Sequence, residues 1–288
     1  MSRPSSPTSS RSSSPPLTLD PATQALLDSF LSEKAEEEKR FRELAEAEAE
    51  AGEDEGNDDE EEVMMNVDEY RKVIGENFGM SQFWYSTPFA NRLASSLHAL
   101  CTPSTRVAFL SSPTGYVAFQ SQPSPLKRTL LFEYDDRFEI LPVVGRTRKE
   151  RRERKESGRD TQGIGKDEGG FVKYDLYEPL KWGEGLRGTV DLAVIDPPYL
   201  NEKTNGLVAQ TLRALLAPNA KLLILTSTSV SFEILQKCYD LPQLGRLRRC
   251  EHAKVVHEGG RIQNPFGMWA TWEGSENFMA DPASSTNL

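Results

Sequence analysis

Residues 190–199 read VDLAVIDPPY, an apolar run that ends in an acid, two prolines and an aromatic residue. A short apolar run bounded by turn residues is typical of a buried strand. The two prolines fix two φ angles and remove two N–H groups, so the turn after this strand is rigid and its carbonyls are free acceptors. The sequence therefore predicts a buried strand that holds Asp196 in a defined position just past its end.

Other apolar runs indicate that this strand is one of several. We expect further strands at 106–110, 129–132, 171–174, 221–225, 253–256 and 268–271. Helical patterns separate them, with helices beginning after Ser86, after Asn201 and near Ser229. Continuous apolar strands that alternate with helices are typical of a parallel sheet covered on both faces. The short connection between the last two strands predicts an antiparallel edge hairpin, so the fold class is α/β and Rossmann-like with seven strands.

Three of the expected strands end in an acid: Glu133, Asp175 and Asp196. In open parallel sheets the ligand lies at the carboxyl ends of the strands, and an acid after the second strand can bind both hydroxyls of a ribose. The loop after the first strand, 111–115, reads SSPTG and lacks the GxGxxG pattern that cradles a pyrophosphate. A cofactor with a ribose and no phosphate fits this combination, and we expect S-adenosyl-L-methionine.

The DPPY turn itself is suited to an amine nucleophile. The Asp196 carboxylate and the Pro197 carbonyl can accept hydrogen bonds from an amino group, while Tyr199 packs against the body of the substrate. Such contacts aim the nitrogen lone pair at a reactive methyl group of the cofactor. The alternative interpretation is an ordinary Asp-Pro turn after a strand.

Four segments together resemble a known family. QFWYS (82–86), LFEYDDRFE (131–139), FVKYDLYEP (171–179) and DLAVIDPPYLNEKT (191–204) resemble the eukaryotic elongation factor 1-alpha lysine methyltransferases of the DPPY type, once described as adenine-N6-specific. The resemblance runs from about Leu19 to Trp272. It implies a seven-stranded class I methyltransferase fold and transfer of a methyl group to a lysine ε-amine.

The resemblance also implies roles for individual residues. Asp196, Pro197, Pro198 and Tyr199 are expected to hold the target amine as the catalytic motif. The expected cofactor-binding residues are Phe83, Trp84, Tyr85, Ser111, Glu133, Tyr134, Asp175, Leu176 and Asp196. Asn264-Pro265-Phe266 is interpreted as a turn near the pocket. No metal site is expected, because the three cysteines and three histidines have no zinc-ligand spacing.

Two rival functions remain open on the sequence alone. The motif also suits an adenine-N6 methyltransferase acting on DNA or RNA, and a non-catalytic methyltransferase-like scaffold is the second alternative. We favour the lysine methyltransferase, with translation elongation factor 1-alpha as its protein partner and a cytoplasmic location. We expect no nucleic-acid partner, since an acidic tail would repel phosphates. We expect no membrane association, since no apolar run approaches the ~20 residues that span a bilayer.

Charge divides the chain into a tail and a domain. Residues 33–69 hold 18 acids and 4 bases, whereas the whole chain has a net charge of -10, so the remainder is mildly basic. We expect residues 1–69 to be a disordered Ser/Pro-rich terminus followed by an acidic helical tail, and residues 70–288 to form the methyltransferase domain. A basic, Gly-rich insertion at 145–170 is interpreted as a flexible surface segment, with nucleic-acid contact as the alternative.

Overall fold

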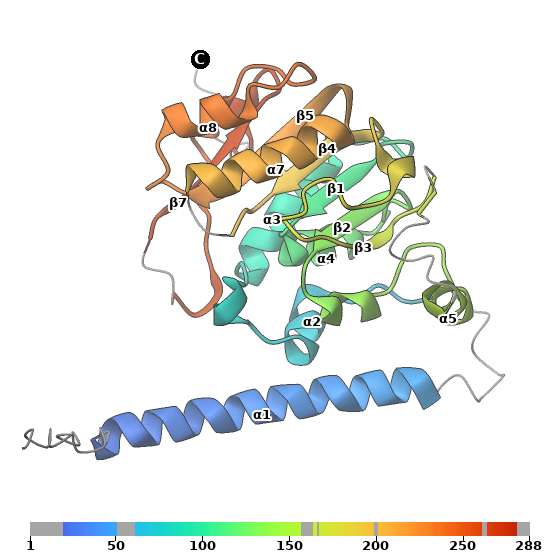
Figure 1. Ribbon diagram of the computed structural model, residues 1–288, viewed down its shortest axis with the longest axis vertical. Coiled ribbons are helices and arrows are strands. Elements are labelled where there is room, and N and C mark those ends of the chain that lie inside the picture. Colours follow the sequence, from blue (N-terminus) through green and yellow to red (C-terminus); the bar gives the residue numbers. More distant parts are fainter. Residues whose placement is uncertain are drawn as a thin grey trace, which may run out of the picture.

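The computed structural model describes residues 20–50, 61–156, 164–165, 167–198, 201–260 and 264–280. Its centre is a seven-stranded sheet in the order β3-β2-β1-β4-β5-β7-β6 (Figure 1). The strands are β1 Val107–Leu110, β2 Thr129–Glu133, β3 Gly170–Lys173, β4 Val190–Ile195, β5 Leu216–Ser227, β6 Arg248–Arg249 and β7 Phe266–Ala270. The first five strands are parallel, and β7 pairs antiparallel with β5 and β6. The predicted α/β fold with an antiparallel edge is therefore confirmed.

One predicted strand is wrong. Residues 253–256 form no strand, and the partner of β7 is instead the short strand β6 at Arg248–Arg249. The short apolar run at 253–256 resembles an edge strand, but Val256 pairs elsewhere, since its carbonyl accepts a hydrogen bond from Ser86 N at 2.8 Å. This contact belongs to the functional site described below.

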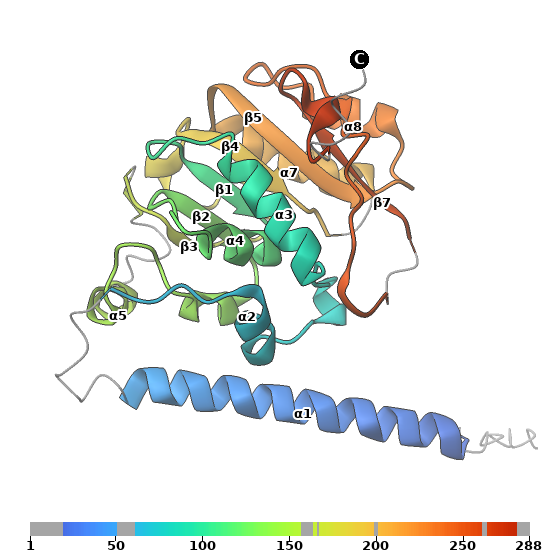
Figure 2. The same ribbon diagram turned by 180° about the vertical axis from the view of Figure 1, so that it is seen from behind.

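Helices cover both faces of the sheet, as Figures 1 and 2 show. One face carries α2 (Val67–Val73), α3 (Thr87–His98) and α4 (Pro113–Gln120), and the other carries α7 (Glu202–Leu215) and α8 (Phe232–Tyr239). The predicted starts of α3 and α7 are confirmed, with Ser86 and Asn201 at the N-cap positions. The sequence prediction had no helix in the place of α4, which follows β1 directly.

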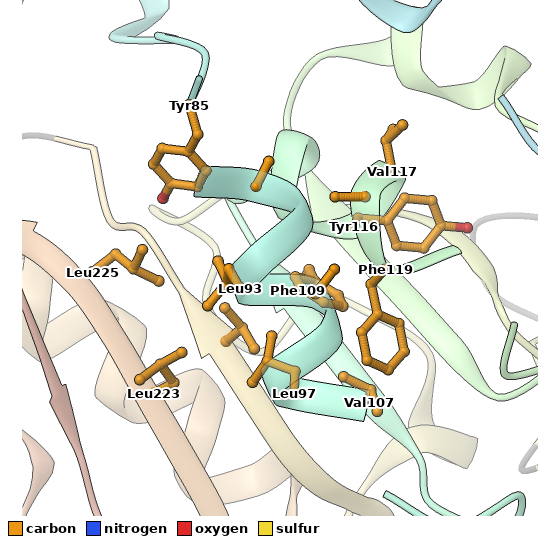
Figure 3. Packing of buried hydrophobic residues seen from close by; sticks show 14 of the residues in the cluster. Tyr85, Leu93, Leu97, Val107, Phe109, Tyr116, Val117, Phe119, Leu223 and Leu225 are labelled. Carbon is orange, nitrogen blue, oxygen red and sulfur yellow. The ribbon is translucent and has the colours of Figure 1, made fainter. Parts of the chain in front are cut away.

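The strands are apolar throughout because each contributes side chains to two cores. Val107 and Phe109 of β1 face α3 and α4, together with Leu223 and Leu225 of β5, as Figure 3 shows. The alternate residues of these strands pack beneath α7 and α8 on the other face. Successive side chains of a strand point to opposite faces, so a central strand covered on both sides needs an unbroken apolar run.

The acidic tail begins with the predicted helix. Helix α1 (Pro21–Glu50) starts after Asp20, whose Oδ1 accepts hydrogen bonds from the backbone N–H groups of Ala22 and Thr23, both at 3.1 Å. Phe41 packs against the core, whereas the leucines of the first turns are exposed. The packed domain starts before the expected residue 70, because Val67 is buried in the core. Residues 1–19 and 51–60 of the expected tail lie outside the described residues.

The basic insertion contains an ordered helix, α5 (Arg148–Glu156). Arg151 Nη2 lies 2.9 Å from Glu62 Oε1, and Arg154 Nη2 lies 3.0 Å from Glu168 Oε2. Glu61 also forms a backbone bridge with Thr147. The end of the acidic tail thus binds the basic helix within the same chain. The described part of the insertion therefore forms a helix held by ion pairs, where the sequence predicted a flexible segment. Residues 157–163 and 166 of the insertion lie outside the described residues.

Among the described residues, no helix has the length and apolar character needed to span a bilayer.

Candidate active site

A cavity of about 620 Å³ opens at the carboxyl ends of the parallel strands. It is lined by residues that follow β1, β2, β3 and β4 and by two segments from outside the parallel sheet. The predicted site residues on its wall are Phe83, Trp84, Tyr85, Ser111, Glu133, Tyr134, Asp175, Leu176, Asp196, Pro197 and Pro198. Tyr199, the remaining member of the predicted motif, lies outside the described residues. The fold therefore brings together eleven positions that are spread over more than a hundred residues of sequence.

Asp196 occupies the centre of this wall. Its backbone N–H donates to the carbonyl of Leu110 at 3.1 Å, which ties the turn after β4 to the end of β1. Its Oδ2 accepts a hydrogen bond from the hydroxyl of Tyr85. Burial raises the pKa of Asp196 to about 7, although the Tyr85 hydrogen bond lowers it and the negative charge of Glu133 raises it further. A carboxyl group with this pKa sits at the end of β4, where the DPPY motif predicted it.

Tyr85 is held in place by a short antiparallel contact between two distant segments. Ser86 N donates to Val256 O at 2.8 Å, and Glu258 N donates to Trp84 O at 2.7 Å, so Tyr85 and His257 lie opposite each other. Arg71 strengthens this contact, since it donates to the Tyr85 carbonyl and lies 3.2 Å from Glu258 Oε2.

His257 is a pocket residue that the sequence analysis missed. It lines the cavity together with Asn264 and Phe266, which confirms that the turn at 264–266 lies near the pocket. The one local signal was the apolar run at 253–256, which was predicted as a strand and instead leads into the segment that pairs with residues 84–86. The pairing is between residues more than 160 positions apart, so no local pattern identifies it.

Glu133 lies at the end of β2, in the position predicted for a ribose-binding acid. Its Oε1 accepts hydrogen bonds from the backbone N–H groups of Tyr134 at 2.9 Å and Asp135 at 3.4 Å. Burial raises the pKa of Glu133 to about 7, although these two hydrogen bonds lower it. The buried Asp135 in turn binds Arg137 through a contact of 2.6 Å and accepts from Gln82 Nε2 at 3.2 Å. This network anchors the turn that carries Glu133.

The loop after β1 explains how the site forms without a GxGxxG sequence. Ser111 has a positive φ of 50°, and α4 begins two residues later at Pro113. A Cβ on Gly115 would lie 2.9 Å from Ser112 Oγ and 3.2 Å from the Phe109 ring. A single glycine therefore permits the close approach of α4 to β1, and a helix start faces the cavity.

The residues present fit S-adenosylmethionine. Glu133 and Asp175 follow adjacent strands, and Trp84 has a buried Nε1 without a hydrogen-bond partner among the described residues. Tyr134 and Tyr177 add two exposed aromatic rings to the cavity wall. Carboxylates suit the hydroxyl groups of a ribose, and aromatic rings suit a purine. Within the described ranges, no group of three or more His, Cys, Asp or Glu side chains is arranged to hold a metal ion.

A mostly parallel seven-stranded sheet with an antiparallel edge, and a cavity of this kind at its carboxyl ends, define an S-adenosylmethionine-dependent methyltransferase of the Rossmann-like class. The family model described as "Probable N6-adenine methyltransferase" matches residues 76–143 and 164–274. The chain belongs to this family.

Curated relatives carry names of a narrower kind. The chain is 32% identical over 205 residues to "Protein-lysine N-methyltransferase EFM5" of Saccharomyces cerevisiae, covering 70% of this chain and 69% of the relative. It is 30% identical over 155 residues to "EEF1A lysine methyltransferase 1" of Bos taurus, covering 54% of this chain and 56% of the relative. The chain thus spans about half to two thirds of the length of these relatives.

A solved structure with a similar chain path is the branched-chain polyamine synthase from Thermus thermophilus in complex with N4-aminopropylspermidine and 5'-methylthioadenosine. Its sequence identity is 15%, its TM-score is 0.46, and the match covers 68% of this chain and 58% of that chain.

Proposed function

We propose that this protein is an S-adenosylmethionine-dependent protein-lysine N-methyltransferase and that its substrate is translation elongation factor 1-alpha. The observation that carries the proposal is Asp196, a buried carboxyl on a rigid turn, held by Tyr85 in the wall of a cofactor-sized cavity. The names of the yeast and bovine relatives support the choice of lysine and of this substrate.

Each side chain has a defined task in this reaction. When bound, the cofactor would supply its sulfonium methyl group to the amine nitrogen, and the electron pair of the C–S bond would remain on sulfur as a thioether. Asp196 and the carbonyl of Pro197 accept hydrogen bonds from the substrate amine, which orients its lone pair. Tyr85 fixes the Asp196 carboxyl through its hydroxyl. A lysine that enters this buried cavity loses solvation, and desolvation lowers its pKa from ~10.4 toward the neutral form that can react.

The position of the basic helix favours a protein substrate over nucleic acid. Arg106, at the amino end of β1, donates from Nη2 to the carbonyls of Gly165 at 2.9 Å and Glu168 at 3.3 Å. The insertion is therefore anchored at the amino ends of the strands, whereas the cavity lies at their carboxyl ends. Arg151 and Arg154 are engaged by Glu62 and Glu168. A flipped adenine in the cavity would need basic contacts along its strand near the cavity mouth.

The test is methyl transfer from labelled S-adenosylmethionine to purified elongation factor 1-alpha and, in parallel, to DNA and RNA. We expect label in the protein alone. Asp196→Asn should reduce the rate by about 100-fold or more, because the amine loses a charged acceptor that orients it. The matched control is Glu178→Gln, which removes an exposed carboxylate whose ion pair among the described residues is a local one, with Lys181 at 2.9 Å.

Three results would contradict the proposal. Label in nucleic acid would identify the adenine-N6 alternative. Absence of both methyl transfer and cofactor binding would favour the alternative of a non-catalytic methyltransferase-like scaffold. If the Asp196→Asn variant transferred methyl groups at the same rate as the Glu178→Gln control, Asp196 would have no role in the reaction.

A further inference from the structure

The cavity extends beyond Asp196 to a part of the sheet that no cofactor residue occupies. In the sheet order, β3, β2 and β1 carry Asp175, Glu133 and Ser111 at their ends, and β4 carries Asp196. The next strands, β5 and β7, lie on the opposite side of β4, and Phe266 is the first residue of β7. The far wall, formed by His257, Asn264 and Phe266, is therefore separated from the ribose carboxylate by Asp196.

His257 has a fixed orientation within this wall. Its backbone is paired with Tyr85, whose hydroxyl binds Asp196. Its imidazole lies 5.4 Å from the Tyr85 ring and 4.6 Å from the Phe266 ring, measured between centroids, and meets Phe266 edge to face. Two aromatic contacts and a paired backbone thus orient the ring, yet no described residue makes a hydrogen bond to its nitrogens. A ring nitrogen is available to a ligand in the cavity.

We propose that His257 is an acceptor-binding residue, whose free ring nitrogen takes a hydrogen bond from the substrate amine while Tyr85 and Phe266 hold the imidazole in position. The proposal rests on the proposed amine methyltransferase function and adds the chemical group that recognises the acceptor on the side away from the cofactor. Asp196 and His257 then accept the two N–H hydrogens of the neutral amine from two sides, with His257 in place of the Pro197 carbonyl as the second acceptor, which leaves the lone pair directed at the methyl group.

The protonation state of His257 is suited to this role. Burial lowers the pKa of His257 to about 4, so the ring is neutral at pH 7 and has one nitrogen that accepts a hydrogen bond. A charged imidazolium has no acceptor and would repel an approaching lysine ammonium.

The first experiment needs no methyl acceptor. Sinefungin, a cofactor analogue with an amino group in place of the sulfonium methyl, presents an amine to the acceptor wall, whereas S-adenosylhomocysteine presents none. For His257→Phe, which keeps an aromatic ring between Tyr85 and Phe266, we expect sinefungin affinity to fall roughly tenfold or more. Affinity for S-adenosylhomocysteine should stay within about twofold. His252→Phe, at an exposed histidine outside the cavity, is the matched control and should change neither.

The second experiment measures kcat/KM on elongation factor 1-alpha. We expect a loss of roughly tenfold or more in His257→Phe and partial recovery in His257→Gln, which restores a hydrogen-bond acceptor. Equal effects of His257→Phe on the two ligands, or none, would overturn the role of His257. An inactive wild-type protein that nevertheless shows the selective loss of sinefungin binding would overturn the proposed substrate and leave the role of His257 standing.

Discussion

At the scale of single residues, the site is defined by two buried carboxyl groups. Asp196 and Glu133 both have a pKa of about 7, chiefly because burial disfavours their charged forms. The negative charge of Glu133 raises the pKa of Asp196 further, and that of Asp135 raises the pKa of Glu133. A folded protein that holds such groups at neutral pH gives up stability for function. This loss of unfolding free energy should be measurable in the protein without cofactor, and it should disappear when the buried carboxyl group is replaced by an amide.

We predict that Asp196→Asn stabilises the empty protein in a pH-dependent way. The pKa of Asp196 is about 7 when folded and ~3.9 when unfolded, so its ionisation favours the unfolded chain. The cost is absent below pH ~4, grows as the pH rises, and is complete above pH ~7. The variant should gain on the order of 2–4 kcal/mol in unfolding free energy at pH 8 and about 1 kcal/mol or less at pH 4.5. Urea unfolding at both pH values measures this, and a gain of equal size at both would contradict it.

Glu133 should make cofactor binding depend on pH. The carboxylate accepts hydrogen bonds from ribose hydroxyls best when it is ionised, and its pKa in the empty site is about 7. Affinity should therefore fall as the pH decreases below 7, by up to about tenfold per pH unit. Glu133→Gln should weaken binding at pH 8 by roughly tenfold or more and flatten the pH dependence. Titration calorimetry with S-adenosylhomocysteine tests both; a wild-type affinity that is constant from pH 5.5 to 8 would refute the prediction.

At the scale of elements, the site depends on how closely α4 approaches β1. Gly115 permits this approach, since a Cβ there would press on Ser112 Oγ and the Phe109 ring. The same short connection places Ser111 and the start of α4 at the cavity. The antiparallel contact between residues 84–86 and 256–258 closes the site from the other side.

We predict that Gly115→Ala costs about 1–3 kcal/mol and weakens cofactor binding, because the added methyl group displaces α4 from β1. The matched control is Gly206→Ala in α7, where a Cβ meets no atom within 4 Å. That variant should be neutral or stabilising by up to about 1 kcal/mol. Thermal unfolding with and without S-adenosylhomocysteine distinguishes the two, and identical behaviour of both variants would show that α4 tolerates the methyl group.

At the scale of the whole molecule, the sheet separates two charged regions. The acidic cavity lies at the carboxyl ends of the parallel strands, and the basic helix α5 lies at their amino ends, where it binds Glu62 and Glu168. A macromolecule bound at the cavity mouth approaches the molecule from the side opposite α5. The structure thus pairs Arg151 and Arg154 of the insertion with acids of this chain.

We predict that lowering the positive charge of α5 leaves catalysis unchanged. The double substitution Arg148→Gln with Arg152→Gln should keep kcat/KM on elongation factor 1-alpha within about twofold, because a substrate at the cavity does not reach the helix. Stability should fall by about 1 kcal/mol or less, the usual contribution of exposed ion pairs. A tenfold loss of methyl transfer at unchanged cofactor affinity would instead place α5 in substrate binding. Steady-state kinetics over a range of salt concentrations makes the comparison.

Local patterns predicted much of this architecture. The apolar runs located β1 to β5 and β7, since central strands buried on both faces need continuous apolar sequence. The DPPY motif and the acids at the strand ends located Asp196, Glu133 and Asp175, because parallel strands place their carboxyl ends at one edge. The prediction failed for β6 and α4. Two residues of β6 carry too little pattern, and α4 is buried along its whole length, which removes the amphipathic periodicity that identifies a helix.

The sequence by itself determined the fold class, the family and the predicted residues of the cofactor half of the site, because those features are carried by short contiguous motifs. Only the tertiary structure added the wall of the cavity that contains His257. His257 reaches the cavity through a backbone pairing with Tyr85, and Tyr85 reaches Asp196 across 111 positions of sequence. It also decided that Glu62, at the end of the acidic tail, pairs with Arg151 of the basic insertion. Such contacts arise from packing between distant segments, and no local periodicity or spacing records which segments will meet.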